Sequence, residues 1–80
     1  MDSHVESTYN YLKDKYGRLI IGKKEVAYEL NIGMSTLDLY IANGIGVPPY
    51  KRATQAKNAR LLFNILDLAI YINDGKIETM

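Results

Sequence analysis

Two segments of the sequence carry nine of its ten basic side chains, and together they could bind negative charge. Residues 44–64 contain four cations and no acid: Lys51, Arg52, Lys57 and Arg60. Residues 13–24 contain five cations and Asp14 as their one acid: Lys13, Lys15, Arg18, Lys23 and Lys24. Because the formal net charge of the whole chain is only +1, this clustering favours a surface for a polyanion. Chance clustering on a solvated surface explains the same charges, and the charges alone leave both readings open.

Residues suited to other kinds of chemistry are scarce. The chain has no cysteine, which excludes disulfides, thiolate metal sites and cysteine nucleophiles. His4 is the single histidine, and with scattered carboxylates it does not supply the ligands of a zinc or iron site. Gly44 and Gly46 are not followed by the Gly-Lys-Ser/Thr of a phosphate-binding loop. We therefore expect no enzyme, no cofactor and no metal.

The length and hydropathy of the chain predict one folded domain over residues 1–80. The hydrophobic fraction of 48% is ordinary for a globular protein. No apolar run approaches the roughly 18 residues that cross a membrane. The first residues lack the basic start and apolar centre of a signal peptide. We expect a cytoplasmic protein without membrane association.

A pair of short helices is predicted over residues 23–43. Asn31 lies between them and tolerates the left-handed backbone conformation that a tight turn needs. Ala27 is small enough for a second helix to cross it closely, and Gly44 ends that second helix. The apolar residues that would face inward are Val26, Ala27, Leu30, Ile32, Leu37 and Tyr40. This spacing favours a helix-turn-helix.

Further elements flank the helix pair. A helix over residues 4–16 is predicted to begin with a capping box, Ser3 to Glu6, and to end at Gly17. A hairpin is expected within residues 45–63, followed by a helix over 65–73 that Asn64 caps, and then a loose tail over 76–80. Residues 53–72 contain no Gly or Pro, so one continuous helix there is the alternative. Five tyrosines on the predicted helices are expected to pack in the core: Tyr9, Tyr16, Tyr28, Tyr40 and Tyr71.

In a helix-turn-helix the second helix lies in the major groove of DNA, and its N-terminal residues contact the bases. The residues at this position here are Met34, Ser35, Thr36, Asp38 and Leu39. The hydroxyls of Ser35 and Thr36 can bond to phosphates or bases. Leu39 is expected to touch a thymine methyl group.

The run KKEVAYELNIGMSTL over residues 23–37 resembles the opening of MerR-type, excisionase-like and AlpA-like DNA-binding domains. Gly46, Pro48, Pro49 and Tyr50 are similar to the entry into the wing of that family, and Phe63, Asp67, Leu68 and Tyr71 are similar to the segment after it. The resemblance covers about residues 19–72. It implies a mainly α winged helix-turn-helix with a small β-hairpin, here with an extra N-terminal helix. Residues expected to contact the DNA backbone are Lys23, Lys24, Tyr50, Lys51, Arg52, Lys57 and Arg60.

The resemblance implies a phage or mobile-element protein that binds duplex DNA selectively, for excision or for transcription regulation. Its partners would be DNA, further copies bound side by side, and a recombinase. No small-molecule ligand is expected, since the chain stops soon after Ile72. Two departures matter: Asp38 stands where the family commonly has a basic residue, and residues 34–43 contain no Lys or Arg. They favour an alternative in which the same fold docks a protein or serves phage DNA packaging without its own DNA affinity.

Overall fold

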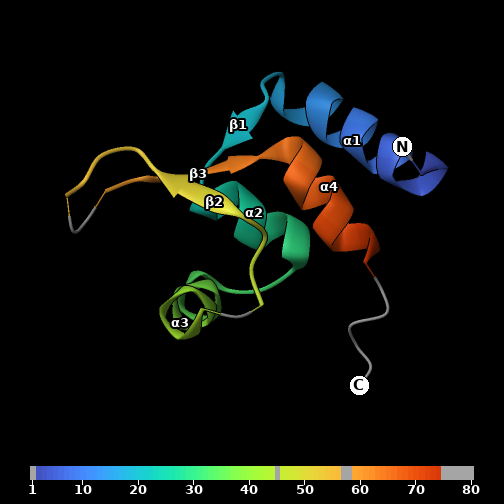
Figure 1. The fold of residues 1–80 in the computed structure, drawn as a ribbon. Coiled ribbons are helices and arrows are strands. Elements are labelled where there is room, and N and C mark those ends of the chain that lie inside the picture. Colours follow the sequence, from blue (N-terminus) through green and yellow to red (C-terminus); the bar gives the residue numbers. More distant parts are fainter. Residues whose placement is uncertain (1, 45, 57–58, 75–80) are drawn as a thin grey trace.

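The computed structural model describes residues 2–44, 46–56 and 59–74. Within these ranges, four helices and three strands follow one another in the order α1, β1, α2, α3, β2, β3 and α4 (Figure 1). Their bounds are α1 Ser3–Tyr16, β1 Ile20–Ile21, α2 Lys23–Leu30, α3 Met34–Asn43, β2 Tyr50–Arg52, β3 Leu61–Asn64 and α4 Ile65–Asn73. The molecule is therefore mainly helical with a small sheet. None of the helices in the described ranges is long and apolar enough to span a bilayer.

Helix α1 begins one residue earlier than expected and with a different cap. Asp2, not Ser3, is the N-cap, and its carboxylate accepts a hydrogen bond of 2.8 Å from the backbone N–H of His4. The predicted capping box at Ser3 is therefore wrong, because the preceding carboxylate fills the same role. The C-terminus follows the prediction, since Gly17 is left-handed at φ 66° and its N–H bonds to the carbonyl of Lys13.

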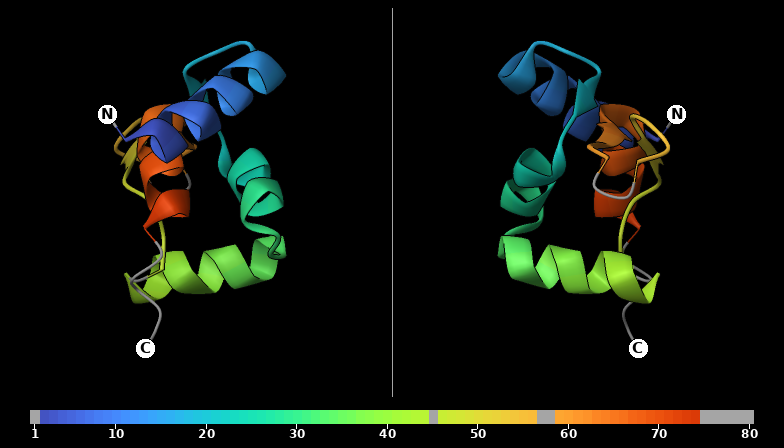
Figure 2. Two further views of the ribbon diagram at one scale, coloured as in Figure 1. Left: turned by 90° about the vertical axis from the view of Figure 1, so that its right-hand side faces the viewer. Right: turned by 90° about the vertical axis from the view of Figure 1, so that its left-hand side faces the viewer.

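Helices α2 and α3 are joined by a tight turn at Asn31, which is left-handed at φ 60° as predicted. The N–H of Asn31 bonds to the carbonyl of Tyr28, and the N–H of Ile32 bonds to that of Ala27. These two bonds satisfy carbonyls at the end of α2 in the manner of a Schellman motif. The turn fixes α3 across the end of α2, and the two helices are in contact (Figure 2). Ala27 of α2 and Leu37 of α3 are both buried.

The three strands form one antiparallel sheet in the order β1-β3-β2. Ile21 and Tyr50 both pair with Phe63, one from each side. Strands β2 and β3 make the predicted hairpin, so the alternative of one continuous helix over residues 53–72 is wrong. Asn64 ends β3 and caps α4, with its side chain accepting a hydrogen bond from Leu66 N–H.

The hydrophobic core lies between the sheet and helices α1, α2 and α4. Its largest fully buried side chains include Phe63, Leu12, Ile65 and Leu68. Helix α1 packs along α4 on the far side of the molecule from α3 (Figure 2). Tyr9 and Tyr16 pack against the core as expected. The prediction for Tyr28 is wrong, because its side chain points outward and is 69% exposed.

Candidate functional site

A groove of about 490 Å³ separates α3 from the hairpin. Lys23 enters it from the start of α2, Asp38 from α3, Arg52 from the end of β2 and Arg60 from just before β3. Its remaining lining residues are Ile41, Ala59 and Leu61. Three cations and one carboxylate from four parts of the chain thus meet in one concave surface. The three cations favour the binding of an anion at this surface, and the Asp38 carboxylate lies beside them.

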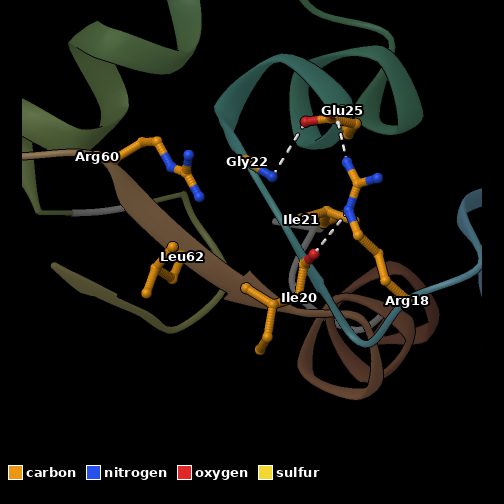
Figure 3. Close-up of a pocket in the computed structure, with 7 residues that line it drawn as sticks. All are labelled: Arg18, Ile20, Ile21, Gly22, Glu25, Arg60 and Leu62. Carbon is orange, nitrogen blue, oxygen red and sulfur yellow. Dashed lines mark hydrogen bonds and ion pairs between the residues drawn. The ribbon is translucent and has the colours of Figure 1, made fainter. Parts of the chain in front are cut away.

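Arg60 lies at the boundary between this groove and a neighbouring hollow of about 390 Å³ (Figure 3). Its side chain points to the start of α2 at Gly22, whereas Ile20 and Leu62 point to the other side of the sheet. In the same hollow Arg18 is already engaged, at 3.2 Å from the Glu25 carboxylate and 3.1 Å from the Ile20 carbonyl. None of the ion pairs between described residues involves Arg52 or Arg60. A guanidinium group can form bidentate bonds to an anion.

Lys23 and Asp38 are bound to each other across the groove. The Nζ of Lys23 lies 2.5 Å from Oδ1 of Asp38, and the two side chains are 33% and 54% exposed. Sequence reasoning placed both residues at the site but did not pair them. A basic residue that was expected to meet backbone phosphate therefore carries its own counter-charge.

The outward face of α3 is a single stripe of exposed side chains. Ser35, Asp38, Leu39 and Ala42 are all exposed, and the pairs 35/38, 35/39, 38/42 and 39/42 are three or four residues apart. Leu39 is 58% exposed, and Met34 in the first turn is 42% exposed. Four of the five residues predicted to face bases are thus exposed, while Thr36 is half-buried. On the inner face of the helix, Leu37 is fully buried.

The first turn of α3 has no side-chain cap. Gly33 is the N-cap residue, in an extended conformation, and it has no side chain to accept from the first backbone N–H groups. These donors, with the positive end of the helix dipole, favour a negatively charged neighbour.

The remaining predicted contact residues are dispersed. Lys24 is exposed on α2. Lys51 is exposed opposite Leu62 and lines a different hollow, on the sheet face that also carries Ile20 and Pro49. The ring of Tyr50 packs on Phe63 with 5.5 Å between centroids, so it is largely a core residue. Lys57, part of the predicted wing and the tail over 76–80 lie outside the described residues.

Sequence reasoning missed a polar cluster between α1 and α2. Glu29 of α2 accepts hydrogen bonds at 3.1 Å from the Tyr11 hydroxyl, 2.5 Å from the Tyr16 hydroxyl and 2.7 Å from the Lys15 Nζ. The Nζ of Lys15 also lies 4.1 Å from the ring centroid of Tyr28. The spacing of four residues between Tyr11 and Lys15 was visible in the sequence, but their meeting with Glu29 depends on how α1 lies relative to α2.

The pKa values in this cluster follow from those contacts. Burial alone would raise the pKa of the Glu29 carboxyl, but the hydrogen bonds from Lys15, Tyr16 and Tyr11 outweigh it and hold that pKa below its usual range. Burial, and then the hydrogen bond to Glu29, raise the pKa of Tyr16 to about 12. The cluster holds the two helices together. It does not line the groove. Among the described residues no group of three or more His, Cys, Asp or Glu side chains could hold a metal ion.

No protein-family model, curated protein or solved structure matches this chain. The basic groove and the exposed stripe of α3 are therefore interpreted from their own geometry and charge.

Proposed function

We propose that the chain is a non-enzymatic, site-selective duplex DNA-binding protein that acts as a small excisionase-like winged helix-turn-helix. The observation that carries this proposal is the groove itself. Two arginines of the hairpin, free of ion pairs among the described residues, line the same groove as α3, whose outward stripe is exposed. An exposed helix flanked by cations is the arrangement that places side chains on base edges and charge on phosphates.

In the proposed complex α3 lies in the major groove. Ser35 and Thr36 bond to bases or to the nearest phosphate, and Leu39 contacts a thymine methyl group. The uncapped N–H groups at the start of α3 face a second phosphate. The hairpin acts as the wing, and Arg52 and Arg60 bind the backbone beside the helix. Base contacts then select the site, while the arginines bind the backbone whatever the sequence.

The proposed role is excision or transcription control in the cytoplasm for a phage or mobile element. Copies would bind side by side, with a recombinase as a further partner. The second candidate is a protein-docking or DNA-packaging module with the same fold. It is favoured by helix α3, which lacks Lys and Arg and exposes two apolar side chains, Met34 at 42% and Leu39 at 58%. Protein interfaces are depleted in charge at their centres.

Salt titration of binding to a random-sequence duplex tests the first candidate. About four phosphate contacts predict that log K falls with log salt at a slope near −3.6. Arg52→Gln and Arg60→Gln should each make the slope shallower by about 0.9 and weaken binding to every duplex alike. Lys13→Gln is the matched control, since Lys13 is exposed on α1 and absent from the groove.

Selection from a pool of duplexes should then enrich one motif, which establishes site selectivity. Absence of binding at low salt would reject DNA binding and leave the protein-docking candidate. Equal losses for Lys13→Gln and Arg60→Gln would show that only the total charge matters and that the groove is not the site.

A further inference from the structure

We propose that Asp38 makes the phosphate contact of Lys23 conditional on a cytosine in the DNA site. This inference rests on the proposed function and concerns the same groove. On random DNA Asp38 holds Lys23, and neither contributes to binding. At the preferred site the carboxylate accepts a hydrogen bond from a cytosine amino group in the major groove, and Lys23 turns to the adjacent phosphate.

The position of the ion pair supports this exchange. Lys23 is the first residue of α2, and Asp38 lies on the outward stripe of α3 that is proposed to face the bases. Both side chains line the groove that also contains Arg52 and Arg60. The pair therefore stands where base edges and backbone would both be within reach, and Asp38 is the only charged residue in the outward stripe.

Because both side chains are exposed, breaking the ion pair between Lys23 and Asp38 costs little free energy. The Asp38 side chain is 54% exposed and that of Lys23 is 33% exposed, so water already reaches both charges. Exposed ion pairs contribute little to stability because solvent screens them and the side chains lose entropy. Breaking this pair for one bond to a base and one to a phosphate replaces one contact with two.

The chemistry of the carboxylate selects the base. An ionised carboxylate only accepts hydrogen bonds, so it needs a donor in the major groove. Cytosine N4 and adenine N6 are the donors there, but adenine presents the acceptor N7 beside its amino group. That acceptor repels a carboxylate, whereas cytosine has no acceptor on its own major-groove edge. Asp38 therefore favours cytosine.

The two arginines differ from Lys23 in this respect. Neither Arg52 nor Arg60 takes part in an ion pair between described residues. They can bind phosphate whatever the sequence, and Lys23 contributes only when Asp38 is occupied elsewhere. In the groove, Arg52 and Arg60 thus contact phosphate on any sequence, and Lys23 contacts it only at the preferred site.

The test is a double-mutant cycle with Lys23→Gln, Asp38→Asn and both together, titrated with salt on a random duplex. We expect Lys23→Gln to leave affinity and slope unchanged there. Asp38→Asn should raise the affinity about two- to fivefold and steepen the slope by about 0.9, because Lys23 is then released. The double variant should return to the unmodified values, since the gain depends on Lys23.

On the selected motif the expected pattern reverses. Lys23→Gln should weaken binding there by several-fold, and Asp38→Asn should relax selection at one C·G position while leaving the other positions unchanged. Thermal unfolding of each variant checks that these exposed substitutions leave the fold intact.

Three outcomes would overturn the proposal while DNA binding itself stands. One is a loss on random DNA for Lys23→Gln equal to that for Arg60→Gln. Another is a gain for Asp38→Asn that persists in the double variant. The third is an unchanged motif for Asp38→Asn. If the unmodified chain binds no duplex, this proposal and the proposed function fall together.

Discussion

At the scale of single residues, Glu29 has the densest set of polar contacts in the part of the chain that the structure describes. Two tyrosine hydroxyls and one ammonium group from α1 converge on this carboxylate of α2. Its side chain is only 7% exposed, so it needs these donors to remain charged. The cluster therefore joins α1 to α2 most strongly while Glu29 is ionised and Tyr16 is protonated.

The pKa shifts set the pH range in which this cluster stabilises the fold. The pKa of Glu29 is lowered by folding, so its contribution is complete above the unfolded value and is lost as pH falls through the folded value. The pKa of Tyr16 is raised from 10.0 to about 12, so its contribution is complete below pH 10 and is lost between about pH 10 and 12. The cluster contributes fully between these two limits.

Tyr16→Phe should lower the free energy of unfolding at pH 7 by about 1.5 kcal/mol, because a hydrogen bond to a charged acceptor is lost. The variant should also lose less unfolding free energy above pH 10, because it has no Tyr16 hydroxyl to titrate. Urea unfolding at pH 7, 9, 10.5 and 11.5 would measure both effects. Tyr9→Phe is the control, since Tyr9 packs against the core from the same helix. If Tyr16→Phe loses as much unfolding free energy between pH 9 and 11.5 as the unmodified chain, the assignment of this loss to Tyr16 is contradicted.

At the scale of elements, the position of α3 depends on contacts made by the segment that follows it. Gly46 is left-handed at φ 73°, and a Cβ there would lie 3.2 Å from Cδ2 of Tyr40 on α3. The carbonyl of Gly46 accepts a hydrogen bond of 2.7 Å from the Tyr71 hydroxyl on α4. Pro48, two residues later, is fully buried. This segment therefore links the end of α3 to α4 through close contacts.

Alanine substitutions at two neighbouring glycines distinguish the cost of backbone strain from the cost of a steric clash. Gly44 has nearly the same conformation, at φ 70°, but an added Cβ would meet nothing within 4 Å. Gly44→Ala should therefore cost about 1 kcal/mol of unfolding free energy from strain alone. Gly46→Ala should cost about 2–3 kcal/mol, because Tyr40 must also move. Chemical denaturation of the two variants measures the difference, and equal costs would show that the contact with Tyr40 is soft.

Local signals predicted most elements, and long-range contacts account for what they missed. Asn31, Gly44 and Asn64 determine their turns and caps through their own backbone preferences, so the sequence indicated them correctly. Tyr28 was misplaced because helical spacing alone could not show that its face of α2 would stay uncovered. The pairing of Lys23 with Asp38 joins residues fifteen positions apart. Such a contact depends on the angle between two helices, which no local pattern encodes.

At the scale of the whole molecule, the proposed contact surface is small. The principal extents of the described structure are 37 × 33 × 20 Å. Helix α3 lies at one end of the molecule, away from α1 (Figure 1), and its residues Asp38 and Ile41 line the groove. In the proposed complex one copy would therefore present a single contact surface to DNA, and a longer site would need additional copies.

One bound copy should protect about 10 base pairs, since the longest extent of 37 Å divided by about 3.4 Å per base pair sets the upper limit. Hydroxyl-radical footprinting on the selected motif would measure this length. Arg60→Gln should lose protection only at the backbone positions nearest the hairpin. A first footprint of about 20 base pairs, at the lowest concentration that gives protection, would show that the chain binds as a preformed dimer.

The order of the sheet also governs how this chain can be made. Strand β3 is central, and both β1 and β2 pair with it, yet it is the last of the three to leave the ribosome. No strand pairing shown by the structure can form in a nascent chain that ends before Leu61. The closing of the loop from Ile21 to Phe63 carries an entropic cost before any core contact repays it. The sheet can therefore form only after residues 61–64 have been made, and α1 can pack against α4 only after residues 65–73 have followed.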